Sequence, residues 1–185
     1  MSNAPIHECK SDSVRFSEFS QVEPEDFVAS RARAAHRLIK IHDPNSGKVN
    51  SLVRAEFFLT PESAADLRRF DTKTFLNRRH DAGFAIAFDG KLRNLFATCG
   101  KGDGIRAAVQ AIALGAVHLS AFGEWLVGFY SRLGWIEVDR VAFDPTCAPE
   151  RWPYELIGTP AVVTMEFQRA IPLGLNERNT DDTSA

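Results

Sequence analysis

Cysteine is scarce in this chain of 185 residues. The three cysteines, Cys9, Cys99 and Cys147, are an odd number and lie far apart. This spacing fits neither a zinc site nor a framework of disulfide bonds. It is typical of a reducing compartment, so we expect a cytoplasmic protein that holds no metal.

The chain also lacks a net charge of one sign and long hydrophobic runs. It has 22 basic and 24 acidic residues and a formal net charge of -2, so no global field attracts it to nucleic acid or to an anionic membrane. No apolar run approaches the ~20 residues of a membrane span. Met1 to Lys10 lacks the apolar core of a signal peptide. We therefore expect a soluble protein without a nucleic-acid or membrane partner.

The length fits one packed domain with loose ends. Ile171 to Ala185 has too little apolar surface to offset the cost of ordering. Pro24 to Ile41 carries apolar residues at steps of four, three and four among its arginines, which predicts a basic amphipathic helix. We expect an N-terminal extension containing this helix over residues 1–49, a globular domain over 50–170, and a disordered tail over 171–185.

The globular domain begins with a strand pattern followed by a helix pattern. Leu52 to Leu59 is rich in strand formers. Thr60 and Pro61 are typical of the N-cap and the first turn of a helix, here Ala64 to Phe70. Further on, Asp89-Gly90 favours a tight turn. It lies between two apolar segments, which predicts a hairpin of strands 83–88 and 91–98.

A glycine-rich stretch follows this hairpin directly. Cys99-Gly-Lys-Gly-Asp-Gly104 leads into apolar residues at helical spacing from Ile105 to Ala116, and Val117 to Phe122 follows as a short apolar strand. The order strand, glycine loop, helix and strand predicts a βαβ-like unit. A further helix is expected to end at Gly134, before two strands over 136–143 and 161–168 that we expect to pair antiparallel.

The glycine loop predicts a site for an anion. Glycines let the backbone approach a ligand closely, and the first N–H groups of the next helix present positive potential. A pyrophosphate is the most natural occupant. Gly102 follows Lys101, which excludes the Gly-Lys-Ser/Thr pattern of phosphate-loop NTPases. Residues 102–107 satisfy G-x-G-x-x-A of dinucleotide sites, with Glu124 downstream to receive a ribose. Too few parallel units follow for a doubly wound sheet.

From Cys99 through Tyr130 to Trp135, the chain resembles the GNAT superfamily of acyl-CoA-dependent N-acyltransferases. The pyrophosphate loop of that family reads Gln/Arg-x-x-Gly-x-Gly/Ala, and this chain supplies both later glycines, Gly102 and Gly104. A Tyr-x-x-x-Gly-Phe segment follows there, and residues 129–135, Phe-Tyr-Ser-Arg-Leu-Gly-Trp, are similar. More loosely, the resemblance extends over Leu52 to Gln168.

The resemblance implies an α/β (α+β) fold. We expect a single GNAT-like domain with a mixed central sheet of about six strands and helices on both faces. Two positions depart from the family pattern: Cys99 replaces Gln or Arg, and Gly123 stands where the family often has Asn. Only one strand lies between the Asp-Gly turn and the glycine loop, where the family usually has two. We therefore expect a sheet trimmed near the acceptor.

The resemblance also implies a site. The loop would bind the pyrophosphate of acetyl-CoA through its backbone amides, and Lys101 or Arg106 would add charge. Tyr130 would be the general acid that protonates the leaving thiolate, although the same tyrosine also continues an apolar stripe and could merely pack. The cofactor-binding candidates are Cys99, Gly100, Lys101, Gly102, Asp103, Gly104, Ile105 and Arg106.

The attacking amine must lose a proton, so a base or a water chain is needed. Glu124, at the start of a helix, and His118, in the preceding strand, are the candidates, although each has an alternative structural role. A thiol near a helix N-terminus has a lowered pKa, so Cys99 could instead accept an acyl group. No His/Asn partnership for that thiol is visible in the sequence.

These patterns leave several functions open. The first is an N-acetyltransferase that moves acetyl or another small acyl group from CoA to an amine on a small molecule, peptide or protein. The second is a non-catalytic CoA-binding or interaction module with the same fold. A dinucleotide-binding protein is a third. The chain could also form a homodimer. The sequence does not mark the acceptor.

Overall fold

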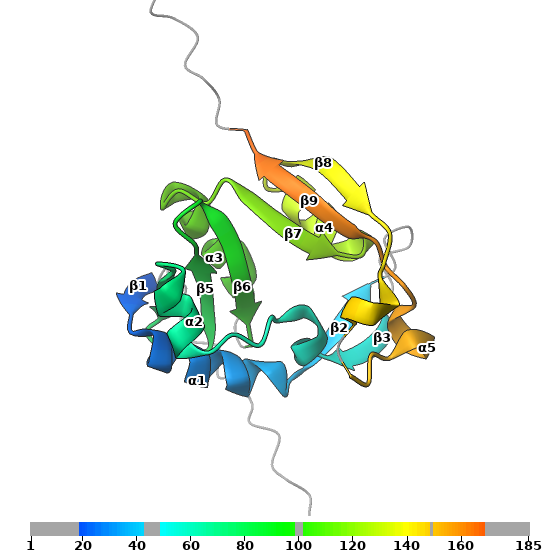
Figure 1. The fold of residues 1–185 in the computed structure, drawn as a ribbon, viewed down its shortest axis with the longest axis horizontal. Coiled ribbons are helices and arrows are strands. Elements are labelled where there is room, and N and C mark those ends of the chain that lie inside the picture. Colours follow the sequence, from blue (N-terminus) through cyan, green and yellow to red (C-terminus); the bar gives the residue numbers. More distant parts are fainter. Residues whose placement is uncertain (1–18, 43–48, 99–101, 149, 169–185) are drawn as a thin grey trace, which may run out of the picture.

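A seven-stranded mixed sheet forms the centre of the computed structural model, which describes residues 19–42, 49–98, 102–148 and 150–168 (Figure 1). Its strand order is β1-β4-β5-β6-β7-β9-β8. A separate pair, β2 and β3, forms a second small sheet. The strands are β1 (Phe19–Val22), β2 (Leu38–His42), β3 (Val49–Arg54), β4 (Lys73–Asn77), β5 (Ala82–Ile86), β6 (Lys91–Ala97), β7 (His118–Phe122), β8 (Trp135–Val141) and β9 (Val162–Phe167).

Helices cover both faces of the large sheet. The α-helices are α1 (Pro24–Ala35), α2 (Ala64–Arg69), α3 (Asp103–Ala113), α4 (Glu124–Ser131) and α5 (Tyr154–Ile157), and the 3-10 helices are η1 (Ala55–Phe58) and η2 (Pro145–Cys147). One apolar cluster joins the sheet to α3 and α4, and a second joins the other face to α1 and α2. Side chains of β5 alternate between them: Phe84 belongs to the first cluster and Ala85 to the second.

The expected fold class is confirmed, with seven strands in place of about six. The hairpin of β5 and β6 forms around the Asp-Gly turn, and β8 pairs antiparallel with β9. Within the described sheet, β6 and β7 are the one parallel pair, and α3 connects them. A doubly wound parallel sheet is therefore not what the described strands form. None of the described helices is long and apolar enough to cross a membrane.

The start of the chain differs from expectation. The helix that we expected to reach Ile41 ends at Ala35, and Leu38–His42 pairs as β2 with β3. The apolar step from Ala35 to Ile39 suggested one more helical turn, but β-branched isoleucines fit a paired strand better. The strand that we expected to run to Leu59 ends at Arg54, where η1 begins.

Two further expectations about local structure are corrected. The N-cap of α2 is Ser63, in a capping box with Asp66, and not Thr60. The sheet is not trimmed, because β4 and β1 extend it beyond β5. In addition, α1, which we placed in an N-terminal extension, packs against β4, β5 and β6.

Candidate functional site

The candidate site lies where β6 and β7 diverge. The two parallel strands pair through Lys91 with His118 and through Leu92 with Leu119, and no further pair is formed along their described lengths. Beyond this point, the register of β6 against β5 shifts, and Asn94 adopts a φ of 50°. A bulge of this kind bends a strand. Figure 1 shows β6 and β7 spreading apart toward their carboxyl ends.

A cavity of about 690 Å³ occupies this divergence. It is lined from both faces of the sheet, by the end of α1 and η1 on one side and by α4 on the other. Phe58 of η1 lies in the lining, with its ring 5.7 Å from that of Trp125 at the start of α4. The cavity is therefore a passage between strands, with aromatic walls.

The glycine loop meets the cavity at one end. Cys99, Gly100 and Lys101 lie outside the described residues. Gly102 caps α3 with a φ of 89°, a conformation that favours glycine. Gly104, in the first turn of α3, and Thr98, just before the loop, both line the cavity. Ile105 is exposed. The N-terminus of α3 and the cavity thus form one continuous site.

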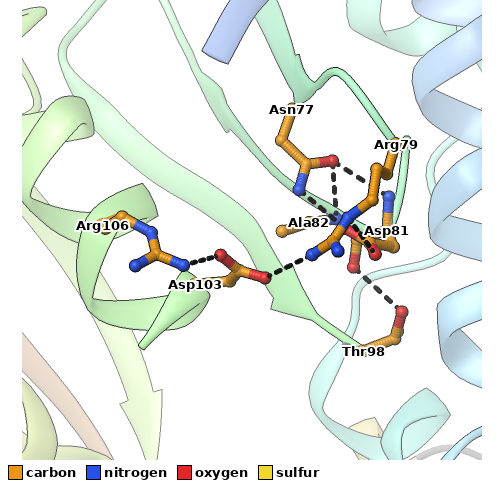
Figure 2. A network of polar contacts seen from close by, with 7 residues as sticks. All are labelled: Asn77, Arg79, Asp81, Ala82, Thr98, Asp103 and Arg106. Atoms are coloured by element: carbon orange, nitrogen blue, oxygen red, sulfur yellow. Dashed lines mark hydrogen bonds and ion pairs between the residues drawn. The ribbon is translucent and has the colours of Figure 1, made fainter. Parts of the chain in front are cut away.

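Asp103 is completely buried at this helix start. Its carboxylate forms ion pairs with Arg106 of α3 and with Arg79, whose Nη2 lies 3.4 Å from Oδ2 (Figure 2). Arg79 comes from the turn between β4 and β5 and also pairs with Asp81, at 3.1 Å. The two guanidinium groups thus face two carboxylates, Asp81 and Asp103, and the charges of this cluster balance. The attraction for an anion at the start of α3 therefore comes from the first N–H groups of the helix.

The turn that carries Arg79 is fixed by hydrogen bonds (Figure 2). Asn77 donates from Nδ2 to the Asp81 carboxylate at 2.6 Å and accepts from the backbone N–H of Asp81 at 3.1 Å. Thr98 donates its hydroxyl to the Asp81 carbonyl at 2.9 Å. Sequence reasoning missed Arg79, because no local pattern links residue 79 to a helix that begins at residue 103.

Tyr130 is buried on α4 and lines the cavity. Its ring packs edge-on against Phe129 and Trp135, with centroids 5.0 and 6.0 Å away. Burial raises the pKa of the Tyr130 phenol well above its ordinary value. The hydroxyl therefore stays protonated at neutral pH and can donate a proton or a hydrogen bond.

The two candidate bases lie outside the cavity lining. Glu124, the first residue of α4, forms an ion pair with Arg140 of β8, and both side chains are partly exposed. His118 stands at the paired end of β7, where its Nε2 lies 3.3 Å from the Asp89 carbonyl oxygen. Tyr130, Gly104 and Thr98 thus line one cavity, whereas Glu124 and His118 are not among the residues that line it.

A buried polar network that the sequence did not reveal stands at the β6 bulge. Asn94 donates from Nδ2 to Glu62 at 2.6 Å, and Arg93 pairs with the same carboxylate at 2.7 Å. Glu62 precedes α2, so its pairing with β6 depends on the tertiary fold. The detectable signal was Asn94 itself, because asparagine is depleted in strands and tolerates the left-handed region.

Comparison with known proteins gives little further guidance. No known protein family and no curated protein matches this chain. It is similar to a solved structure from Rhodopseudomonas palustris described as "GCN5-Related N-acetyltransferase: Aminotransferase, Class-II", at 13% identity over 86% of this chain and 100% of that one, with a TM-score of 0.46. It is also similar to a ribosomal-protein-alanine N-acetyltransferase from Brucella melitensis, at 14% identity over 80% and 97% of the two chains, with a TM-score of 0.43. Likenesses this distant do not assign an activity to this chain.

Proposed function

We propose that this chain is an acyl-CoA-dependent N-acyltransferase that transfers acetyl, or another small acyl group, to a primary amine. One observation carries the proposal: a single cavity runs from the start of α3, between the diverging strands β6 and β7, to the buried phenol of Tyr130. This arrangement suits a long, anionic carrier with a reactive group at its far end.

The anionic end of the carrier fits the start of α3. The first N–H groups of a helix are unpaired and attract a phosphate. Arg79 and Arg106 neutralise the carboxylates of Asp81 and Asp103, so this cluster presents no net negative charge to the phosphate. The narrow arm of the carrier would then enter between β6 and β7, where backbone groups on the facing edges of the strands are not paired with each other.

The proposed reaction is direct transfer. The nitrogen of a neutral amine attacks the thioester carbonyl carbon, a C–N bond forms, and the C–S bond breaks as the thiolate leaves. Tyr130 gives its phenolic proton to the departing sulfur. The proton that the nitrogen loses restores the phenol, directly or through water. The products are an amide and free CoA, and no other reactant is needed.

The raised pKa of Tyr130 suits this role only because the site is enclosed. A phenol with a high pKa is a weak acid toward a thiolate in water. Inside the cavity, desolvation also raises the pKa of the thiol, so the proton transfer becomes less unfavourable. Because the phenol is neutral at physiological pH, it also adds no negative charge beside the thioester.

Thermal unfolding and acyl transfer together test this proposal. We expect CoA and acetyl-CoA to raise the melting temperature of the wild type, because a ligand that binds the folded state stabilises it. Tyr130→Phe should keep this shift but lower acyl transfer by about 10²-fold, within the usual range for a general acid. Tyr154→Phe, which changes an exposed tyrosine, is the matched control and should retain full activity.

The other outcomes separate the alternatives. A melting shift with NAD and none with acetyl-CoA would favour a dinucleotide site. CoA binding without turnover across a panel of amines, together with no effect of Tyr130→Phe, would favour a non-catalytic module.

A further inference from the structure

One buried carboxylate holds two neighbouring residues of β6. Glu62 stands just before α2 and is 8% exposed. Its Oε1 pairs with Nη2 of Arg93 at 2.7 Å, and its Oε2 accepts a hydrogen bond from Nδ2 of Asn94 at 2.6 Å. Glu62 is itself anchored to α1, because Arg31 donates to its backbone carbonyl at 2.9 Å. The carboxylate is therefore a fixed point that holds β6 in place.

These two contacts are specific to a bulged strand. In a regular strand, the side chains of adjacent residues point to opposite faces, so one carboxylate would not reach both. Here two residues of β6 lie opposite one residue of β5, and Asn94 has a φ of 50°. The buried face of β6 also changes: Leu92 belongs to the apolar cluster beside α3 and α4, and Phe96 to the cluster beside α1 and α2. A straightened β6 would lose at least one bond to Glu62.

The bulge decides where β6 leaves β7. The parallel pairing of the two strands ends at Leu92 and Leu119, directly before the two residues that Glu62 holds. A bulge bends its strand and interrupts the ladder. The cavity occupies the divergence that follows. The contacts of Glu62 thus stabilise the conformation in which the gap between the strands exists.

A carboxylate is a costly way to fill this position. Burial of a charge is unfavourable unless the charge is paired and hydrogen-bonded. A buried ion pair can often be replaced by apolar side chains of similar size with little or no loss of stability. What apolar side chains would not supply is the pair of directed bonds to Arg93 and Asn94. Glu62 therefore specifies the shape of β6 more than it adds to the stability of the fold.

We propose that Glu62 is the positioning residue of this site: its carboxylate holds the bulge of β6 and so keeps the gap between β6 and β7 open before the carrier binds. A gap that is already open spares the carrier the free energy of separating two paired strands. Glu62 acts through β6, because it is not among the residues that line the cavity. The identity of the carrier as an acyl-CoA rests on the proposed function.

Hydrogen exchange of Glu62→Gln tests this role without any ligand. The glutamine has the same shape, but its NH2 group must face one of the two donors, Arg93 or Asn94. With the bulge released, β6 should straighten and extend its pairing with β7. We expect the cavity-facing amides near the carboxyl ends of both strands to exchange at least about threefold more slowly than in the wild type. A merely structural role would leave these rates unchanged or raise them, and either result would overturn the assignment.

Calorimetric titration with CoA gives a second readout. In Glu62→Gln we expect the Kd for CoA to rise about tenfold, because losing one hydrogen bond to a charged group lowers the population of the open conformation. Ser63→Ala is the matched control: it removes the neighbouring helix cap and leaves the contacts of Glu62 in place. This control should bind CoA with the wild-type Kd. An unchanged Kd in Glu62→Gln, or an equal rise in Ser63→Ala, would contradict the proposal.

A double variant keeps the test decisive if Glu62→Gln folds poorly. Glu62→Met combined with Arg93→Met replaces the ion pair by apolar side chains, which protein interiors usually tolerate. Its free energy of unfolding should match or exceed that of the wild type, while exchange at the cavity edges should again become slower. Fast exchange there in a stable double variant would overturn the role of Glu62.

The two proposals fail in different ways. If CoA gives no melting shift with the wild type, the acyltransferase function fails, whereas the exchange rates of the free protein still decide whether Glu62 holds the gap. If CoA binds the wild type, but Glu62→Gln exchanges as fast as the wild type or keeps its Kd, the assignment of Glu62 alone fails.

Discussion

At the scale of single residues, sequence patterns placed a residue within its own helix but could not identify residues that meet only in the folded chain. The apolar stripe that contains Tyr130 located this residue correctly on a helix, and its side chain both packs in the core and lines the cavity. Asn94 and Glu62 were missed, because they lie 32 positions apart and meet only in the folded chain. A sequence pattern reports residues on the same element, and it carries no information about this pair.

The buried phenol of Tyr130 predicts a specific loss of stability in alkali. Burial raises its pKa above the ordinary value of about 10. The folded state therefore holds this proton more tightly than the unfolded state. The resulting stabilisation is complete below about pH 10 and is lost as the pH rises toward the folded-state pKa. Between about pH 10 and pH 11 the loss is about 1 kcal/mol.

Urea unfolding at several pH values measures this loss. Tyr130→Phe should show a shallower decline than the wild type over the same range, whatever its stability at neutral pH. Tyr154→Phe should follow the wild-type curve, because Tyr154 is exposed. Parallel curves for wild type and Tyr130→Phe would show that the phenol is not buried as described.

At the scale of elements, the sequence located helices and strands that have a clear turn motif or a regular apolar spacing, and it missed the short strands that have neither. The Asp-Gly turn located the hairpin of β5 and β6, and the apolar spacing after Gly104 located α3. The edge strand β1 has the sequence Phe-Ser-Gln-Val, and only its pairing with β4 makes it a strand. The short strand β4 was missed for the same reason, since its buried character comes from neighbours distant in sequence.

The corrected start of α2 can be tested by mutation. Ser63 accepts a hydrogen bond from the backbone N–H of Asp66 at 3.1 Å, and the Asp66 carboxylate accepts one from the backbone N–H of Ser63 at 3.1 Å. Ser63→Ala should lower the free energy of unfolding by about 1 kcal/mol, the usual effect of losing an N-cap. Chemical denaturation gives the value. Thr60→Ala, at the cap we first expected, should have the smaller effect; a reversed order would contradict the capping box.

At the scale of the whole molecule, the sheet consists of two halves with little backbone pairing between them. Strands β1, β4, β5 and β6 form one half, and β7, β9 and β8 form the other. Two parallel residue pairs join them at one end, and the cavity separates them at the other. No sequence pattern predicted this divergence, because it arises from a bulge in one strand and a short contact with the next.

Hydrogen exchange should report this divided sheet. Backbone amides near the carboxyl ends of β6 and β7 that face the cavity should exchange quickly in the free protein, because they form no hydrogen bond with the facing strand. Acetyl-CoA should slow exchange in both segments. Peptides from β8 should change little, because this strand lies at the far edge of its half. Slow exchange at the cavity edges without ligand, or protection confined to β8, would contradict this description. Mass spectrometry of peptides from each strand gives the measurement.

The cavity is lined on one side by Ala34, residues 37–39, Ala55 and residues 58–60, and on the other by residues of α3 and α4, so its two walls come from separate segments of the chain. Under the proposed function, variation at the residues of the first wall would alter which amine is chosen, while the wall that binds the carrier stays unchanged. A library randomised only at Arg37, Leu38 and Phe58, all in the first wall, would then be expected to yield new acceptor preferences.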